Sequence, residues 1–154
     1  MNYFEDVEIG LSATLGSHTF TREEIIAFAT DYDPQPFHTD DEAAKRSPFG
    51  ALCASGWHTA ATWMKCLMEY QTRSIAEGKP VRAAGASPGF RNMRWLKPVY
   101  AGDTITYTTA VTEKTASRSK PEWGVVRSYN TGTNQHGELV FEFEGAVLVR
   151  RRNV

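Results

Sequence analysis

The stretch WHTAATWMKCLMEYQTRSIAE at residues 57–77 contains neither glycine nor proline, and Gly78 follows it directly. Ala60, Met64, Leu67 and Met68 recur near the spacing of one helical face, and a glycine is typical just beyond a helix end. The initial turns are apolar over more than half of their circumference. A helix of this kind needs a cover, so we expect it to be the one long helix of the fold, packed against a sheet.

Shorter helices are predicted before this stretch. Thr21-Arg-Glu-Glu24 has the form of a capping box and opens the run EEIIAFATDY, which should end before Pro34. Thr39-Asp-Asp-Glu42 is a second capping signature, and it opens the short run DEAAKR. The segment ATLGSHTF at residues 13–20 has the character of a first strand.

After Pro80 the pattern becomes that of strands. ITYTTAVTEKT (105–115), GVVRSYNT (124–131) and ELVFEFEGAVLVRRR (138–152) are rich in β-branched and aromatic residues. Asn134-Gln-His-Gly137 is typical of a hairpin turn between the last two. One strand, a long buried helix and a run of antiparallel strands predict an α+β fold in which a curved antiparallel sheet wraps the helix, the hotdog arrangement.

Length and composition limit the class of protein. With 154 residues, of which 41% are hydrophobic and 23% charged, we expect residues 1–154 to form a single domain with its own core. A net charge of -1 favours neither nucleic acid nor an acidic membrane surface as partner. Because no apolar run reaches the roughly 18 residues of a membrane span and the start lacks a signal-peptide pattern, we expect a cytoplasmic protein with a small-molecule partner.

The segment Asp31-Tyr-Asp-Pro-Gln-Pro-Phe-His38 carries the most informative chemistry. Two prolines restrict its backbone, which predicts a rigid, non-helical loop that places Asp33 five residues before His38. A carboxylate and an imidazole that converge on one water molecule can deliver hydroxide to one carbon and a proton to its neighbour, if desolvation raises the pKa of the aspartate. The residues alone are equally consistent with a turn-capping Asp33 and a surface His38.

The motif Asp33-Pro-Gln-Pro-Phe-His38 resembles the Asp-x-Asn-Pro-x-His motif of the MaoC-like, or (R)-specific enoyl-CoA hydratase, family of hotdog proteins. Three further segments resemble landmarks of that family in the same order: residues 49–56 before the long helix, residues 94–104 at a strand opening, and the turn at residues 134–137. The resemblance therefore extends over nearly the whole chain.

This resemblance implies a hydro-lyase that adds water reversibly to a 2-enoyl thioester. It implies that Asp33 and His38 are the catalytic pair, and that the N–H of Gly56, where the long helix begins, polarises the thioester carbonyl. A helix N-terminus presents unpaired N–H groups suited to that task. We expect a side chain at position 56 to project into the place of the substrate oxygen, although Gly56 is also consistent with a tight turn into the helix. No metal and no cofactor are expected beyond coenzyme A as part of the substrate.

Three residues beside the catalytic ones, Gln35, Ser55 and Trp57, are expected to contact the substrate. Gln35 replaces the asparagine of the family motif and is one methylene longer, which leaves open the alignment of the pair and the substrate range. Ser55 precedes the helix, so an N-cap is favoured for it, with orientation of Asp33 as the alternative.

Other candidates are weaker. Asp31 is a rival for the acid role but is favoured as a helix-end carboxylate, His58 as a core or cap histidine, and Cys53 as a small buried hydrophobe. The basic tail Arg150-Arg-Arg152 could contact the phosphates of coenzyme A, together with Lys97 and Arg94, although such a run is more often a solvated strand end.

Two other functions are consistent with the same sequence. One is a hotdog thioesterase, in which water attacks the carbonyl carbon, and the other is a non-catalytic module that binds acyl groups. The acyl carrier, either coenzyme A or a carrier protein, is left open. From the resemblance we expect a homodimer or a dimer of dimers, whose sheet edges protect each other.

Overall fold

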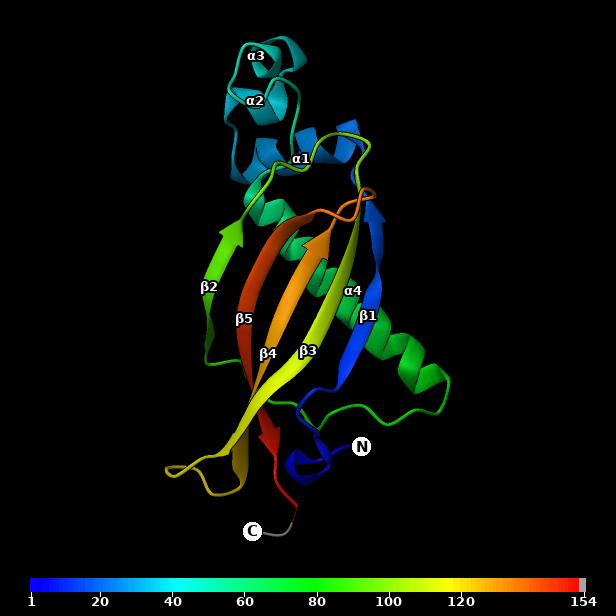
Figure 1. The fold of residues 1–154 in the computed structure, drawn as a ribbon, viewed down its shortest axis with the longest axis vertical. Coiled ribbons are helices and arrows are strands. Elements are labelled where there is room, and N and C mark those ends of the chain that lie inside the picture. Colours follow the sequence, from blue (N-terminus) through cyan, green and yellow to red (C-terminus); the bar gives the residue numbers. More distant parts are fainter. Residues whose placement is uncertain (153–154) are drawn as a thin grey trace.

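The computed structural model describes residues 1–152 and is built around one five-stranded antiparallel sheet (Figure 1). Its strands are β1 (Ser12–Thr19), β2 (Gly89–Trp95), β3 (Thr104–Ala116), β4 (Trp123–Thr133) and β5 (Leu139–Arg150). Their order across the sheet is β1-β3-β4-β5-β2. The last three strands in sequence therefore form the centre, and β1 and β2 form the two edges.

The long helix α4 (Gly56–Ala76) lies across one face of this sheet (Figure 1). Its buried side chains join the main core with residues from β1, β3 and β5, among them Leu15, Ile105 and Phe141. The buried hydroxyl of Tyr107 on β3 donates a hydrogen bond of 2.8 Å to the carbonyl of Thr59 on α4. The α+β hotdog fold is thus confirmed, with the sheet covering the helix as the sequence predicted.

The buried face of α4 differs from the predicted apolar stripe. Thr59, Thr62 and Cys66 face the core, whereas Met64 and Met68 are 49% and 45% exposed. Threonines can occupy this face because their hydroxyls bond back to helix carbonyls, as Thr62 does to the carbonyl of His58 at 2.9 Å. The expectation that both methionines belong to the covered face was wrong.

Short helices gather near the N-terminus of α4 (Figure 1). As predicted, α1 (Arg22–Tyr32) begins at Thr21, whose side chain accepts a hydrogen bond from the N–H of Glu24, and it ends before Pro34. The helix α3 (Asp41–Lys45) has Asp40 as its N-cap, not Thr39, because the Asp40 carboxylate accepts the N–H of Ala43 at 2.7 Å.

The loop expected to be non-helical contains one helical turn, α2 (Pro36–Thr39). Proline is compatible with the first position of a helix, because the N–H that it lacks would have no intrahelical partner there. This turn corrects the prediction, and it sets the direction of the His38 side chain.

The strand β2 was also missed. Its sequence, GFRNMRW, is mostly exposed and does not alternate between apolar and polar residues, and its register with β5 shifts between Arg91 and Arg94. The predicted hairpin between β4 and β5 is confirmed, because Gly137 donates its N–H to the carbonyl of Asn134 at 3.0 Å with a φ of 76°.

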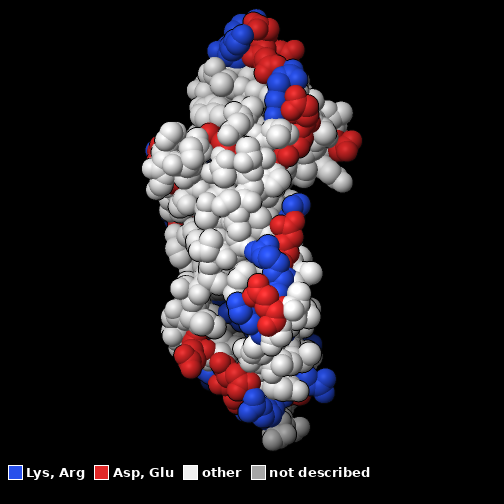
Figure 2. Space-filling model, turned by 90° about the vertical axis from the view of Figure 1, so that its right-hand side faces the viewer, with Lys and Arg blue, Asp and Glu red and all other residues white. Residues whose placement is uncertain are grey.

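The surface that carries β1 and α4 mixes charges of both signs, which lie mainly towards its two ends and along one side (Figure 2). A face of this kind has no extended field of one sign. Within residues 1–152, none of the helices combines the length and the apolar character that crossing a bilayer requires.

Candidate active site

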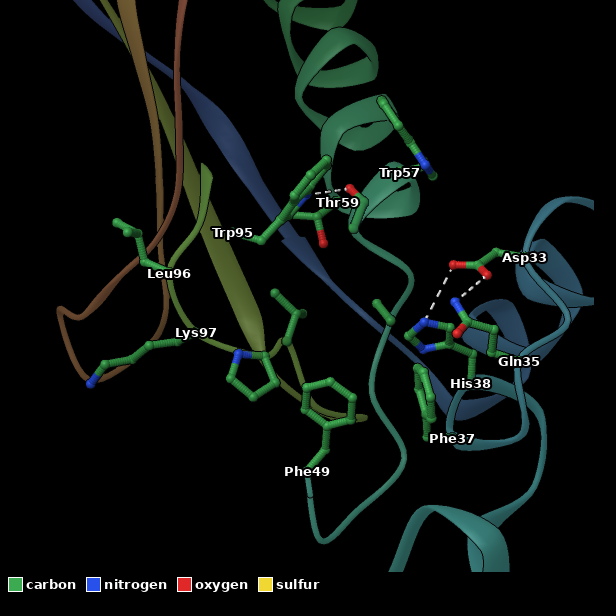
Figure 3. Close-up of a pocket in the computed structure, with 14 residues that line it drawn as sticks. Asp33, Gln35, Phe37, His38, Phe49, Trp57, Thr59, Trp95, Leu96 and Lys97 are labelled. Atoms are coloured by element: carbon green, nitrogen blue, oxygen red, sulfur yellow. Dashed lines mark hydrogen bonds and ion pairs between the residues drawn. The ribbon is translucent and has the colours of Figure 1, made fainter. Parts of the chain in front are cut away.

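A cavity of about 370 Å³ lies beside the N-terminus of α4, between the α1–α2 loop and the segment that follows β2 (Figure 3). Aromatic and aliphatic side chains form most of its wall, and a few polar groups enter it. Its lining residues include Asp33, Gln35, Phe37, His38, Phe49, Gly56, Trp57, Thr59, Trp95, Leu96 and Lys97.

The structure brings Asp33 and His38 together in this cavity. Asp33 is the residue directly after α1, and His38 lies in the single turn of α2. The His38 N–H donates to the carbonyl of Gln35 at 2.9 Å, which closes the loop between the two side chains. Asp33 Oδ2 lies 3.4 Å from His38 Nε2 (Figure 3). The two groups are therefore close enough to act on one small molecule.

The buried imidazole of His38 is held in one orientation. Its Nδ1 lies 2.6 Å from the carbonyl oxygen of Cys53. Because a carbonyl can only accept, Nδ1 carries the proton of this hydrogen bond. In the neutral imidazole, Nε2 is then an acceptor that faces Asp33, which suits a general base.

Cys53 contributes its backbone to this arrangement. Its thiol is buried, and burial raises the pKa of the thiol to about 11. A thiol in that state is a poor nucleophile, which agrees with the prediction of a small buried hydrophobe.

Two donors hold the carboxylate of Asp33. Gln35 Nε2 donates to Oδ1 at 2.7 Å, and Ser55 Oγ donates to Oδ2 at 2.8 Å. Burial by itself raises the pKa of Asp33. The two hydrogen bonds, together with the charge of His38 when its imidazole is protonated, outweigh burial, so that the pKa lies below its ordinary value. The aspartate is a carboxylate at neutral pH. The condition named from the sequence, a pKa of Asp33 raised by desolvation, is therefore not met in the net shift.

Ser55 stands at the N-cap position of α4, as predicted. Its side chain makes no capping hydrogen bond, however, and bonds Asp33 instead. Three roles were considered for Ser55: an N-cap, the orientation of Asp33 and a substrate contact. The structure shows the orientation of Asp33, and Ser55 is buried and is not among the residues that line the cavity.

Gly56 is the first residue of α4, so its N–H precedes the i to i−4 ladder of the helix, and the residue lines the cavity. The indole Nε1 of Trp95 donates to the Gly56 carbonyl at 2.7 Å. A Cβ at position 56 would lie 2.6 Å from the Trp95 ring. A side chain there would strike Trp95 first, which corrects the expectation that it would take the place of a substrate oxygen.

Trp57 lines the cavity and packs edge to face on Trp95, with ring centroids 5.3 Å apart. Sequence analysis did not single out Trp95, although it belongs to the segment compared with the family. A large aromatic residue shortly before Pro98 was the feature of the sequence that could have indicated Trp95 as a cavity residue.

The remaining candidates lie elsewhere. Asp31 is exposed on α1 and is not part of the cavity wall. His58 is buried, stacks on Phe28 with centroids 4.6 Å apart and faces Glu24, as a core histidine does.

The basic tail lies at the end of the sheet remote from α1 and α2 (Figure 1). There Arg151 pairs with Glu5, and Arg152 with Asp6. Of the cationic residues considered for phosphate contact, Lys97 lines the cavity, where it pairs with Glu138. Among residues 1–152, no group of three or more His, Cys, Asp or Glu side chains is arranged to hold a metal ion.

Comparison with known proteins places this geometry in a family. The model of the MaoC like domain matches residues 9–133. The chain belongs to the MaoC-like family. One relative of this MaoC-like protein, the uncharacterized protein YdeM of Bacillus subtilis, is 30% identical over 147 residues, which cover 96% of this chain and 98% of YdeM.

Two further comparisons come from Rhodospirillum rubrum. Its (R)-specific enoyl-CoA hydratase is 29% identical over 153 residues, which cover 99% of the MaoC-like chain and 94% of the hydratase. A crystal structure of a MaoC-like dehydratase from this organism superposes with a TM-score of 0.84 at 35% identity and covers 100% of both chains.

The contact between Gly56 and Trp95 can be tested by stability. Gly56→Ala is expected to lower the free energy of unfolding by about 1–3 kcal/mol, because the added methyl group must displace the Trp95 ring. Trp95→Leu removes that ring, so Gly56→Ala should lower the free energy of unfolding by less in the Trp95→Leu background than in the wild type. Urea unfolding of the two single variants and the double variant measures this difference. Strict additivity of the two substitutions would contradict the contact.

Proposed function

We propose that this MaoC-like protein catalyses the reversible addition of water to the 2,3-double bond of a 2-enoyl thioester. The observation that carries the proposal is the convergence of Asp33 Oδ2 and His38 Nε2, 3.4 Å apart, in a cavity that also contains the N-terminus of α4. Membership of the MaoC-like family and the similarity to an (R)-specific enoyl-CoA hydratase support it.

Both groups of the pair are acceptors when the imidazole is neutral. A water molecule can donate one hydrogen to the Asp33 carboxylate and the other to His38 Nε2, which leaves an oxygen lone pair directed at the substrate. As the oxygen bonds to C3, the π electrons move to C2 and the thioester oxygen, and one of the pair takes a proton from the water. The same proton is then delivered to C2, so that the elements of water add across the double bond on one face.

The thioester oxygen carries enolate charge during this addition. In this proposal the N–H of Gly56, at the N-terminus of α4, donates to that oxygen, and the positive end of the α4 dipole reinforces it. Holding such charge with a fixed donor lowers the barrier without any rearrangement of solvent.

Crotonyl-CoA tests the proposal against its alternatives. A hydratase removes the enone absorbance and releases no thiol, whereas a thioesterase releases free thiol. A non-catalytic acyl-binding module would bind the thioester and turn it over by neither route. A panel of trans-2-enoyl thioesters on coenzyme A and on a carrier protein would then define the chain length and the carrier.

The catalytic pair can be tested by conservative substitution. Asp33→Asn and His38→Gln should each lower the turnover of crotonyl-CoA by roughly a hundredfold to ten-thousandfold, the range for general acid–base groups. Asp31→Asn, exposed on α1, is the control and should retain most activity. Near wild-type turnover by either folded pair variant would refute the assignment.

We also propose a homodimer that forms along β2. Large apolar side chains are exposed along this edge strand and on α4, which is unusual for a surface left to solvent. They are Trp57, Met64, Met68, Phe90, Trp95 and Leu96. A second copy that extends the sheet at β2 would cover them, and the cavity, which Trp57 and Trp95 line, would lie next to the interface.

Sedimentation at micromolar concentration should therefore show a dimer or a multiple of it. Phe90, which is 58% exposed on β2, is expected to lie in the interface, so Phe90→Asp should shift the protein towards monomer. Ile9 is 62% exposed and precedes the opposite edge strand, which makes Ile9→Asp the matched control. A monomeric wild-type protein with full activity would overturn the proposed dimer.

A further inference from the structure

Gln35 occupies a constrained place in the α1–α2 loop. It lies between Pro34 and Pro36, serves as the N-cap residue of α2, and donates its backbone N–H to the Asp33 carbonyl at 2.7 Å. Its side chain turns back so that Nε2 donates to Asp33 Oδ1, also at 2.7 Å (Figure 3). Backbone and side chain of Gln35 thus both bind the same aspartate.

The two oxygens of Asp33 have different surroundings. Oδ1 receives the Gln35 amide, and Oδ2 receives the Ser55 hydroxyl and lies 3.4 Å from His38 Nε2. Rotation of the carboxylate would break both hydrogen bonds at once. The two donors therefore hold the carboxylate in one orientation, and Gln35 supplies the donor on Oδ1.

We infer that Gln35 is a positioning residue, whose amide holds Oδ1 of Asp33 so that Oδ2 stays aimed at His38 and at the reacting water. This inference rests on the proposed function, and it gives Gln35 a role different from the substrate contact that the sequence suggested. The amide acts through Asp33 and needs no contact with the substrate.

The charge state of Asp33 depends on the same contact. Burial raises its pKa, and the Gln35 amide is first among the contacts that bring it below the ordinary value. Removal of this donor should therefore raise the pKa of Asp33, and a carboxylate in its place should raise it further. Activity that requires ionised Asp33 is lost as the pH falls through this pKa. The scheme also requires a neutral His38, so the acidic limb of the pH profile reports both groups, and a titration of Asp33 itself isolates the change.

The experiment compares Gln35→Met, which removes the donor at nearly the same length, with Gln35→Glu, which replaces it by a second carboxylate. The profile of kcat/KM against pH is measured for crotonyl-CoA. Both variants should lose about tenfold to a hundredfold in kcat/KM at neutral pH, the effect of one lost hydrogen bond to a charged group. The loss should lie in kcat.

Gln71→Glu is the matched control, because it makes the same chemical change on α4 about four helical turns beyond Gly56. It should leave the profile unchanged. A wild-type profile in both Gln35 variants would overturn the inference. So would a rise in KM alone, since that would make Gln35 a substrate contact.

A second readout is independent of turnover. Titration of the Asp33 carboxyl carbon by NMR should give a pKa below the ordinary value in the wild type and a higher one in both Gln35 variants. If the wild type hydrates no enoyl thioester but the titration shifts as stated, the proposed function fails and the hold of Gln35 on Asp33 stands. An Asp33 titration that is identical in all three proteins overturns the inference whatever the activity.

Discussion

The hydroxyl of Ser55 lies where the loop that carries the acid–base pair meets the long helix, and its hydrogen bond of 2.8 Å to Asp33 joins the two parts of the site. The carbonyl of the same residue accepts the N–H groups of His58 and Thr59 at 3.0 and 3.1 Å and so opens α4. One buried residue therefore fixes the carboxylate relative to the free N–H groups of the helix. The Tyr107 hydroxyl ties the next turn of α4 to the sheet, and the site inherits the rigidity of the core.

Much of the fold could be predicted from periodicity. The long helix has apolar residues at helical spacing, and the strands β3, β4 and β5 are rich in β-branched and aromatic residues. The turn before β5 contains Asn134 and Gly137, which are typical turn residues. The strand β2 could not be found in this way, because an edge strand with both faces exposed in the single chain has no alternation to detect. The face of α4 was misjudged at Met64 and Met68 because threonines, which satisfy their hydroxyls within the helix, took the covered positions.

The site shows a similar division. The family resemblance indicated Asp33, His38 and Gly56, and all three line one cavity in the structure. The sign of the pKa shift of Asp33 could not be predicted, because it depends on two donors, one of them 22 residues away in the chain. The close approach of Trp95 to Gly56 was likewise invisible, since it joins the end of an unpredicted strand to the start of the long helix.

The protonation of the pair bears on the choice between hydration and thioester hydrolysis. His38 Nδ1 donates its proton to the Cys53 carbonyl, and Asp33 is ionised. In the neutral imidazole, Nε2 and the carboxylate are then both acceptors, so a hydrogen-bond donor is needed between them. A water molecule supplies that donor in hydration, and the 3-hydroxyl group of the product supplies it in the reverse direction, so one arrangement serves both. Hydration also requires that a proton be kept and returned to carbon, because the enolate formed at C2 persists until it is protonated. Thiolate leaves a tetrahedral intermediate without such help, so a hydrolase would need one group of this pair only to accept a proton. In the proposed hydratase the group that accepts the proton also returns it to C2.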